Sequence, residues 1–266
     1  MSKLTVKDLL ALKGQRQLTQ VYVRNPGEAA ACEAAGIDLI VTEEGSDVAA
    51  IRAAAPETFF TVGLLYGRYP SVVDAMRGAY GAMSIGADCI YCPLSLEYVR
   101  SMAAEAVPVT GHVGFVPYKS TWFGGFKAVG KTAPEALKVY DLALAHQDVG
   151  AIGVEVEIVP QEVAAEITRR LDILTLGMGA GPGCDAQYLF ATDILGDNTG
   201  HIPRHAKVYR DHKSEYERLH RDAIAAFGEF KADVDSGTYP ASDHVLRADE
   251  SELAAFVQAL EDRPAP

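Results

Sequence analysis

The chain has 266 residues, of which 48% are hydrophobic and 23% are charged, as in ordinary globular proteins. Its formal net charge of −12 at pH 7 argues against a nucleic-acid partner, because such proteins carry concentrated positive charge. No run of about 18 apolar residues could span a membrane, and the N-terminal stretch lacks the apolar core of a secretion signal. We therefore expect a cytoplasmic protein without a membrane partner.

Short β-branched runs alternate with alanine-rich amphipathic segments, which is typical of repeated βα units around a parallel sheet. The pattern predicts strands at 18–23, 38–41, 59–64, 89–92, 107–112, 151–157 and 173–176, with a weakly marked eighth near 199–202. Helices are predicted between them, at 26–35, 71–85, 134–149 and 160–171. The sequence thus predicts an α/β protein with one (β/α)8 barrel domain over residues 1–266, an N-terminal helix and a C-terminal helical extension.

The cysteines show no paired framework. Cys89 and Cys92 form a lone C-x-x-C within an apolar run, where an extended strand would point the two sulfurs to opposite faces. Because no second pair accompanies them, we interpret them as core thiols and not as zinc ligands or a redox pair.

Two carboxylates and one histidine end predicted strands, where the active site of a (β/α)8 barrel lies. Glu155 and Glu157 share a strand face because residues two apart point the same way, and a partly buried carboxylate there can act as a general base. His112 ends an apolar run that passes into a glycine-rich loop. The alternatives are a salt-bridged strand-end glutamate and a structural histidine.

Four stretches carry a family resemblance: VPVTGHVGFVPYKSTWFGGFKAVG at 107–130, GVEVEIVP at 153–160, LGMGAGPGCDAQYLFATDILG at 176–196, and SGTYP at 236–240. On these motifs the chain resembles the ketopantoate hydroxymethyltransferase family, which belongs to the phosphoenolpyruvate/pyruvate superfamily. The likeness covers nearly the whole chain, but it is strong from Val107 onward and weaker before that residue.

The resemblance implies a reaction of pantothenate biosynthesis on a 2-oxo acid. In the family, a divalent metal such as Mg²⁺ chelates 3-methyl-2-oxobutanoate while a glutamate removes the C3 proton. The enolate then takes up the methylene group of 5,10-methylenetetrahydrofolate, which gives 2-dehydropantoate. Glu157 matches the family's base, and His112 matches the histidine that hydrogen-bonds the substrate. Glu155 has no counterpart with a role there and is expected to support the other two.

The metal site is where the sequence departs from the family. Glu44 falls on the metal position after the second strand, whereas Gly63 falls on the position after the third. Tyr91 and Pro93 replace a lysine and a glutamate after the fourth strand. Because Mg²⁺ is usually held by one or two carboxylates with waters and substrate oxygens, Glu44 alone predicts weak metal binding or none.

The remaining candidates concern the substrate. We predict that Gly45, Tyr91 and Gly179 contact it, and a glycine-rich loop can leave room for an anion. Arg24 and Arg68 follow the first and third predicted strands and could pair with a substrate carboxylate in place of the missing lysine. Both are equally well interpreted as solvated loop arginines.

Two other functions stay open on the sequence. One is a divergent aldolase or lyase of the same superfamily, acting on another 2-oxo acid or β-hydroxy acid. The other is a non-catalytic barrel homologue, although retention of both His112 and Glu157 speaks against it. Since members of the family form rings of dimers, we also expect a homo-oligomer, with a decamer as the leading interpretation.

Overall fold

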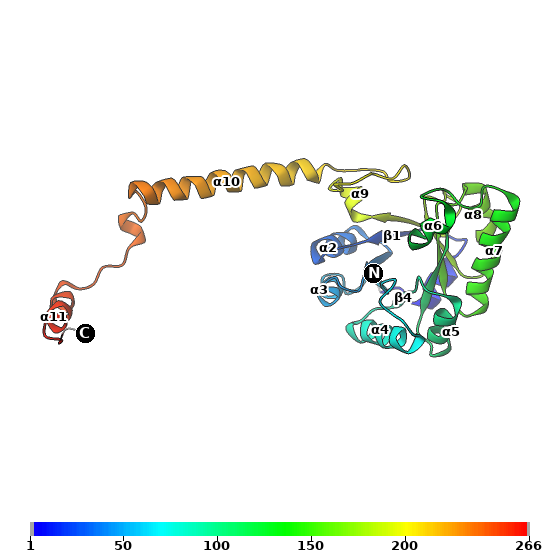
Figure 1. Cartoon of the computed structure of the whole chain (residues 1–266), viewed down its shortest axis with the longest axis horizontal. Coiled ribbons are helices and arrows are strands. Elements are labelled where there is room, and N and C mark those ends of the chain that lie inside the picture. The colour runs from blue at the N-terminus through cyan, green and yellow to red at the C-terminus, as the bar shows by residue number, and fades with distance from the viewer. Residues whose placement is uncertain (1–2, 265–266) are drawn as a thin grey trace. The chain divides into compact units, whose positions relative to one another are not determined.

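The computed structural model describes residues 3–264, and within them eight parallel strands close into a barrel (Figure 1). The strands follow one another in sequence order, and β8 pairs with β1 to close the sheet. They are β1 (Leu18–Tyr22), β2 (Leu39–Glu43), β3 (Phe59–Gly63), β4 (Cys89–Tyr91), β5 (Val109–Gly114), β6 (Gly153–Glu157), β7 (Leu174–Met178) and β8 (Ala186–Phe190). The expected (β/α)8 barrel is confirmed.

Helices cover the outside of this barrel (Figure 1). They are α1 (Val6–Leu12), α2 (Pro26–Ala35), α3 (Val48–Ala54), α4 (Val72–Ile85), α5 (Leu96–Ala104), η1 (Pro117–Lys119), α6 (Ser120–Phe123), α7 (Ala133–Asp148), α8 (Gln161–Thr168) and α9 (Ala191–Leu195). Helix α2 shows how local sequence sets the ends of a helix. The Asn25 side chain accepts a hydrogen bond from the Glu28 N–H, proline occupies the first turn, and Gly36 ends the helix in a left-handed conformation. No helix within residues 3–264 is long and apolar enough to cross a membrane.

The eighth strand lies elsewhere than predicted. It spans Ala186–Phe190 and pairs with β1 over its whole length, whereas residues 199–202 form no strand. The prediction was wrong because the strand is short and follows directly on the glycine-rich turn after β7, so the sequence looked like one continuous loop. Its alternation is nevertheless clear in the structure, since Ala186 and Tyr188 are buried and their neighbours are partly exposed.

Alternate residues of each strand pack on opposite sides of the sheet, and this separates the core into an inner and an outer part. Inside, Leu18, Phe59 and Leu174 pack with Leu9 of α1, which closes the N-terminal end of the barrel. Outside, the other strand residues pack against the helices.

Cys89 belongs to the inner cluster and Cys92 to the outer one, and burial raises their thiol pKa values to about 12 and about 11. The interpretation of these residues as core thiols is confirmed.

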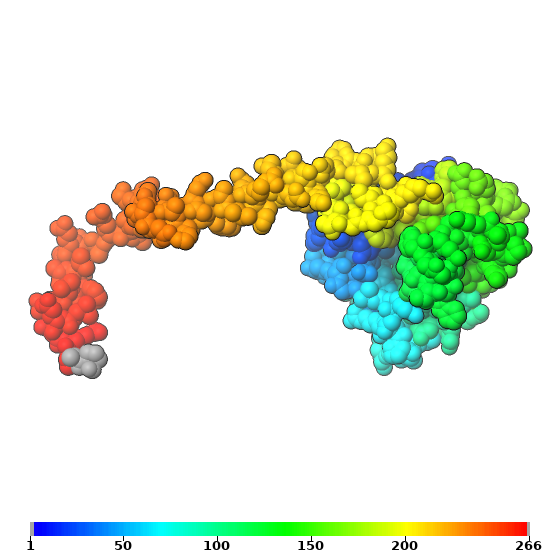
Figure 2. Space-filling model, turned by 45° about the horizontal axis from the view of Figure 1, so that its top comes forward, coloured from blue at the N-terminus to red at the C-terminus, as the bar shows by residue number. Residues whose placement is uncertain are grey.

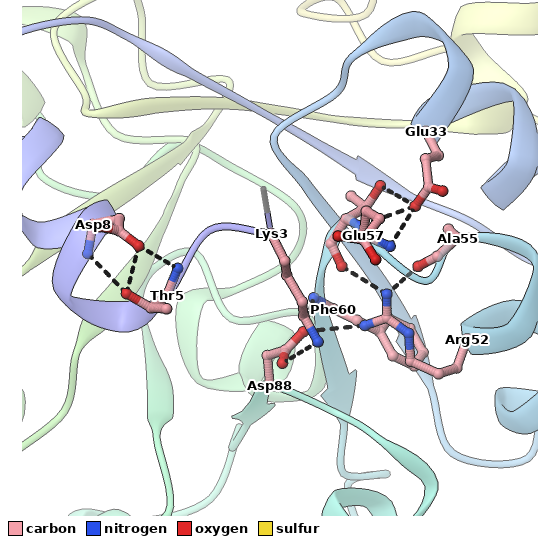
Figure 3. A network of polar contacts seen from close by, with 10 residues as sticks. Lys3, Thr5, Asp8, Glu33, Arg52, Ala55, Glu57, Phe60 and Asp88 are labelled. Atoms are coloured by element: carbon pink, nitrogen blue, oxygen red, sulfur yellow. Dashed lines mark hydrogen bonds and ion pairs between the residues drawn. The ribbon is translucent and has the colours of Figure 1, made fainter. Parts of the chain in front are cut away.

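A polar network fixes the N-terminal ends of the strands on one side of the barrel (Figure 3). The Asp88 carboxylate, just before β4, accepts from the Phe60 N–H of β3 at 3.0 Å, from Arg52 at 3.1 Å and from Lys3 at 2.6 Å. Arg52 also donates to the Thr58 carbonyl at 2.9 Å. These charge-assisted bonds stabilise the closed end of the barrel, so the opposite end is the one that loops can shape for function.

The chain divides into two units, the barrel up to Asp211 and a C-terminal unit that begins at His212. The second unit contains α10 (His212–Ser236), η2 (Ser242–His244) and α11 (Glu250–Glu261). None of its described residues is buried (Figure 2). Exposed apolar side chains occur along both helices, at Tyr216, Leu219, Ile224, Phe227, Phe230 and Val234 of α10 and at Leu253, Phe256, Val257 and Leu260 of α11.

We propose that the apolar face of α10 is covered in an assembly of several copies, because a helix of this length rarely leaves large apolar side chains in water. Light scattering at micromolar concentration should therefore give a mass well above the 28.5 kDa of one chain. The double variant Phe227→Ser and Phe230→Ser should lower that mass, whereas Val73→Ser, at an exposed position on α4, should not. A wild-type mass of 28.5 kDa would contradict the proposal.

Candidate active site

A cavity of about 330 Å³ opens at the C-terminal end of the barrel, opposite the network around Asp88. The strands contribute inward-facing residues from their last positions, among them Tyr22, Glu43, Gly63, Tyr91, His112, Glu155, Glu157, Met178, Tyr188 and Phe190. A larger groove of about 500 Å³ between α7 and α8 is lined mainly by apolar side chains and lacks such a convergence of polar groups. The mouth of the barrel is therefore the candidate active site.

Strand β6 places two carboxylates at different depths in this mouth. Glu155 lies beside His112 of β5 in the parallel register, and Glu157 lies beside Gly114, one step nearer the rim. Gly114 has a φ of +85°, and a side chain there would meet the Glu157 carbonyl oxygen at 2.4 Å. The close approach of β5 and β6 thus requires glycine at this position. Glycine in turn lets the chain turn out of the barrel directly after His112.

His112 is the centre of the polar contacts at the mouth. Its Nε2 lies 3.0 Å from the Phe115 carbonyl oxygen and 3.1 Å from Oε2 of Glu157. Its Nδ1 lies 2.7 Å from the Tyr91 hydroxyl and 3.7 Å from Oε2 of Glu155. Since the Phe115 carbonyl can only accept, Nε2 carries a hydrogen that points at this carbonyl, and in the neutral imidazole Nδ1 accepts from Tyr91. The ring is thus held in one orientation, with Nε2 3.1 Å from Oε2 of Glu157.

Burial shifts the acid–base properties of the deeper carboxylate. The pKa of Glu155 is raised to about 7, mainly by burial, against the opposing effect of His112 and with a smaller contribution from the negative charge of Glu157. Burial, together with the charge of Glu155, also raises the pKa values of Tyr91 and Tyr188 well above 10. Both phenols consequently stay protonated at neutral pH, with the Tyr91 hydrogen donated to Nδ1 of His112 and Tyr188 lining the cavity as a further hydrogen-bond donor.

Of the residues predicted to form the site, His112, Glu157 and Tyr91 lie together in this cavity, and Glu155 lies beside them. Glu44 does not line it. Its carboxylate accepts from the Leu65 N–H at 2.8 Å and from the Tyr69 hydroxyl, and it lies 3.6 Å from Arg68. Glu44 therefore fixes the loop after β3 instead of pointing into the barrel.

The other predicted substrate contacts also lie outside the lining of the cavity. Arg24 pairs with Glu28 at 2.7 Å and with Asp197 at 2.8 Å, so acidic groups already neutralise its charge. Arg68 has a side chain that is 57% exposed. Gly45, with a φ of +103°, and Gly179, where a side chain would meet the ring of His205, are turn positions in the surrounding loops.

The predicted metal position at Glu44 does not fit the divalent metal that the family resemblance implies. No group of three histidine, cysteine, aspartate or glutamate side chains within residues 3–264 is arranged to hold a metal ion. Both oxygens of Glu44 are engaged in the loop contacts. A side chain at Gly63 would meet the ring of Tyr91 at 3.1 Å, so the tyrosine occupies the space that a carboxylate after β3 would need.

Sequence reasoning missed most of the aromatic lining, which includes Tyr22, Tyr66, Tyr118, Tyr188 and Phe190. It also chose Glu44 where Glu43 is the carboxylate that lines the cavity. The period-two alternation of the strands could have identified Glu43 and the aromatic residues of the strands. Val41 and Glu43 of β2 share the inward face, as do Tyr188 and Phe190 of β8. Extending the inward face of each strand to its last residue identifies these positions.

Comparison with known proteins places the chain in a family. The family model described as ketopantoate hydroxymethyltransferase matches residues 45–242. The chain belongs to the ketopantoate hydroxymethyltransferase family. It is 33% identical to the 3-methyl-2-oxobutanoate hydroxymethyltransferase of Thermus thermophilus, over 90% of the chain and 98% of that protein. Its identity to the Deinococcus radiodurans enzyme of the same name is 35%, over 80% and 81% of the two chains. The expected resemblance and a transferase-type enzyme are confirmed.

Two solved structures share the fold of this family member at low identity. A 2,3-dimethylmalate lyase, described as a PEP mutase/isocitrate lyase superfamily member, has a TM-score of 0.52 at 14% identity, covering 96% of the chain and 99% of that protein. A phosphonopyruvate hydrolase in complex with oxalate and Mg²⁺ has a TM-score of 0.51 at 14% identity, covering 98% and 99%. At this identity the two structures establish the barrel fold alone.

The raised pKa of Glu155 predicts a pH-dependent stability. Below pH 4.5, the ordinary pKa of a glutamate, the Glu155 carboxyl is neutral in both the folded and the unfolded chain, so its burial costs nothing. As the pH rises from there through about 7, the unfolded chain is free to ionise this carboxyl whereas the folded chain is not, so the free energy of unfolding falls. Glu155→Gln removes this titration, so it should raise the melting temperature more at pH 8 than at pH 5. A shift from 4.5 to about 7 corresponds to up to roughly 3 kcal/mol at pH 8.

Calorimetric melting at both pH values is the measurement. The control is Glu162→Gln on the exposed side of α8, which should leave the pH dependence close to that of the wild-type chain. Equal effects of Glu155→Gln at pH 5 and pH 8 would show that this carboxyl does not titrate as its burial requires.

Proposed function

We propose that the chain forms a carbon–carbon bond between the enolate of a 2-oxo acid and a one-carbon unit. The family's reaction, with 3-methyl-2-oxobutanoate as acceptor and 5,10-methylenetetrahydrofolate as donor, is the first candidate. The observation that supports this most is the pair of Glu157 and His112, 3.1 Å apart in the mouth of a barrel that belongs to this family. A cytoplasmic location is part of the same proposal.

Glu157 is the proposed general base. It takes the proton from C3 of the 2-oxo acid, and the electron pair of the broken C–H bond delocalises onto the oxo oxygen. His112, whose Nε2 lies 3.1 Å from Oε2 of Glu157, positions the carboxylate for this transfer. C3 then bonds to the methylene carbon of the donor and water supplies the new hydroxyl group, while both C–N bonds of that methylene break. The two nitrogens of the departing tetrahydrofolate take up the proton held by Glu157 and the remaining proton of water.

The enolate oxygen requires a hydrogen-bond donor or a cation. A divalent cation would polarise the oxo group and stabilise the enolate charge, but no group of three potential metal-ligand side chains within residues 3–264 is arranged to hold one. The hydroxyl of Tyr188 is a donor that the chain itself supplies, since it stays protonated and lines the cavity, whereas Tyr91 donates its hydrogen to His112. We therefore assign stabilisation of the enolate to Tyr188.

A second candidate is an aldolase or lyase that uses the same base on another 2-oxo or β-hydroxy acid. The observation in its favour is the changed end of β4, where Tyr91 and Pro93 line the cavity in place of the lysine and glutamate implied by the family resemblance. A substrate different from that of the family is the simplest consequence of a different lining. The proton transfer at Glu157 is common to both candidates.

Glu157→Gln should abolish proton exchange at C3 of 3-methyl-2-oxobutanoate, because it removes the base without changing the volume. General-base catalysis contributes about 10²–10⁴-fold, and the exchange rate followed by NMR in D2O should fall by at least about 100-fold. Glu162→Gln makes the same chemical change on the barrel surface and should exchange at the wild-type rate. Wild-type exchange in Glu157→Gln would remove Glu157 from the mechanism.

Metal dependence should be weak, because the Glu44 carboxylate is engaged by backbone and tyrosine groups. Calorimetric titration of the chain with Mg²⁺ or Mn²⁺ should show little heat without a 2-oxo acid present. Any binding that appears with the 2-oxo acid should persist in Glu44→Gln, since that carboxylate does not face the cavity. Tight metal binding to the free chain that Glu44→Gln abolishes would mean that the loop after β3 rearranges to form a metal site.

A further inference from the structure

We propose that a groove beside the mouth of the barrel binds the tail of the one-carbon donor, an aromatic amide that carries carboxylates. The groove encloses about 400 Å³, and its lining includes Gly114, Trp122, Phe123, Lys127, Val129 and Lys138. We call it the lysine groove. The inference rests on the proposed function and deepens it, because it assigns a site to part of the co-substrate.

The lysine groove lies next to the ends of β5 and β6. Gly114, which lines it, is the register neighbour of the proposed base Glu157. Two backbone hydrogen bonds hold the loop of the groove against β6. The Phe115 N–H donates to the Glu157 carbonyl at 2.8 Å, and the Val129 N–H donates to the Ile158 carbonyl at 3.1 Å. The groove is therefore fixed beside the residue that takes the proton.

The chemistry of the donor fits this position. In 5,10-methylenetetrahydrofolate the reacting methylene joins two nitrogens, and one of these nitrogens carries a benzoyl ring with a glutamate on its far side. When the methylene carbon meets C3 of the 2-oxo acid beside Glu157, the ring is held a single bond beyond that nitrogen. The segment after β5 borders both places, because Tyr118 lines the mouth and Trp122 lines the lysine groove. The tail can therefore run from the mouth into the groove.

The charge of the lysine groove suits carboxylates. Lys127 and Lys138 line it, and neither forms an ion pair with a described residue. The acidic residue of the lining is Glu135, whose carboxylate already accepts from the Lys131 N–H at 3.1 Å. By contrast, no lysine or arginine of the described chain lines the mouth. In a chain with a net charge of −12, the two unpaired lysines form a local positive site that a ligand with two carboxylates would neutralise.

The lysine groove also presents an aromatic surface. Trp122, the single tryptophan of the chain, is 88% exposed. Its neighbour Phe123 is held in place by the core, because its ring centroid lies 5.9 Å from that of the buried Phe115. The indole is thus the ring whose face is open, and a benzoyl group bound in the groove can stack on it.

The single tryptophan gives a direct measurement of binding in the groove. The chain labelled with 5-fluorotryptophan has one fluorine resonance, at Trp122, which should shift when 4-aminobenzoylglutamate is titrated. Because both lysines are exposed, each contact with a carboxylate should contribute about threefold to fivefold in affinity. The neutral probe 4-aminobenzamide keeps the ring and the amide but has no carboxylate, so it should bind about tenfold more weakly.

A pair of double variants tests the two lysines. Lys127→Gln with Lys138→Gln should lower the affinity for 4-aminobenzoylglutamate about tenfold and leave the affinity for 4-aminobenzamide unchanged. Lys7→Gln with Lys213→Gln makes the same change of charge at exposed positions of α1 and α10, and it should alter neither affinity. Full affinity for the charged probe in the first double variant would overturn the assignment of the lysines.

The aromatic surface is tested by ligand-observed NMR, which needs no tryptophan. Trp122→Ala removes an exposed side chain and should leave the fold intact, but it should weaken the binding of both probes several-fold. Tyr80→Ala removes an aromatic side chain that is 47% exposed on α4 and should bind both probes as the wild-type chain does. Equal affinities in these two variants would overturn the stacking on Trp122.

Two further results would overturn the proposal as a whole. One is equal affinity of the wild-type chain for the two probes. The other is a fluorine resonance that moves when the protein is diluted and not when the probe is added, which would identify Trp122 as a contact between copies of the chain.

Failure of this proposal and failure of the proposed reaction are distinguishable, because proton exchange at C3 requires no donor. Exchange that depends on Glu157, without binding of 4-aminobenzoylglutamate at Trp122, would keep the reaction and reject the lysine groove as the donor site. Binding at Trp122 without proton exchange would keep the groove as a site for an aromatic carboxylate and reject the reaction.

Discussion

The enclosure of Glu155 and Glu157 on one inward face of β6 is the constraint on which the rest of the mouth depends. Strand geometry forces residues two apart to the same side, and barrel closure makes that side the interior. Two desolvated negative charges on one strand are costly unless neighbouring groups compensate. His112 lies between the two, with Nε2 3.1 Å from Oε2 of Glu157 and Nδ1 3.7 Å from Oε2 of Glu155, so one imidazole compensates both carboxylates.

The hydroxyl and imidazole groups around these carboxylates form one connected system. The Tyr91 hydroxyl contacts Nδ1 of His112, and Nε2 on the opposite side of the ring faces Glu157. When one of these groups gains or loses a proton, its neighbour must change between donating and accepting a hydrogen bond. The backbone carbonyl of Phe115 fixes the tautomer of the imidazole, because it accepts a hydrogen bond from Nε2. A rigid imidazole between two carboxylates is a preorganised arrangement for moving a proton at the outer one.

The sequence predicted the barrel well because each βα unit carries its own local signals, such as the cap of α2 and the apolar alternation of the strands. It failed at β8, where a five-residue strand follows a glycine-rich turn and carries little periodic signal. Within the site, His112 and Glu157 could be found because each ends a well-marked strand. The choice between Glu43 and Glu44 could not be made without the register of β2, since a shift of one residue reverses the face.

The residues at the ends of β3 and β4 are matched in size. The ring of Tyr91 lies against Gly63, where even a β-carbon would come within 3.1 Å of it. A large aromatic residue on β4 therefore favours the smallest residue on β3, and an aspartate on β3 would displace the ring. Because the Tyr91 hydroxyl also contacts His112, a carboxylate at position 63 would disturb the imidazole that lies beside Glu157. The small residue on β3 thus gives space to a phenol that is bonded into the acid–base system of the mouth.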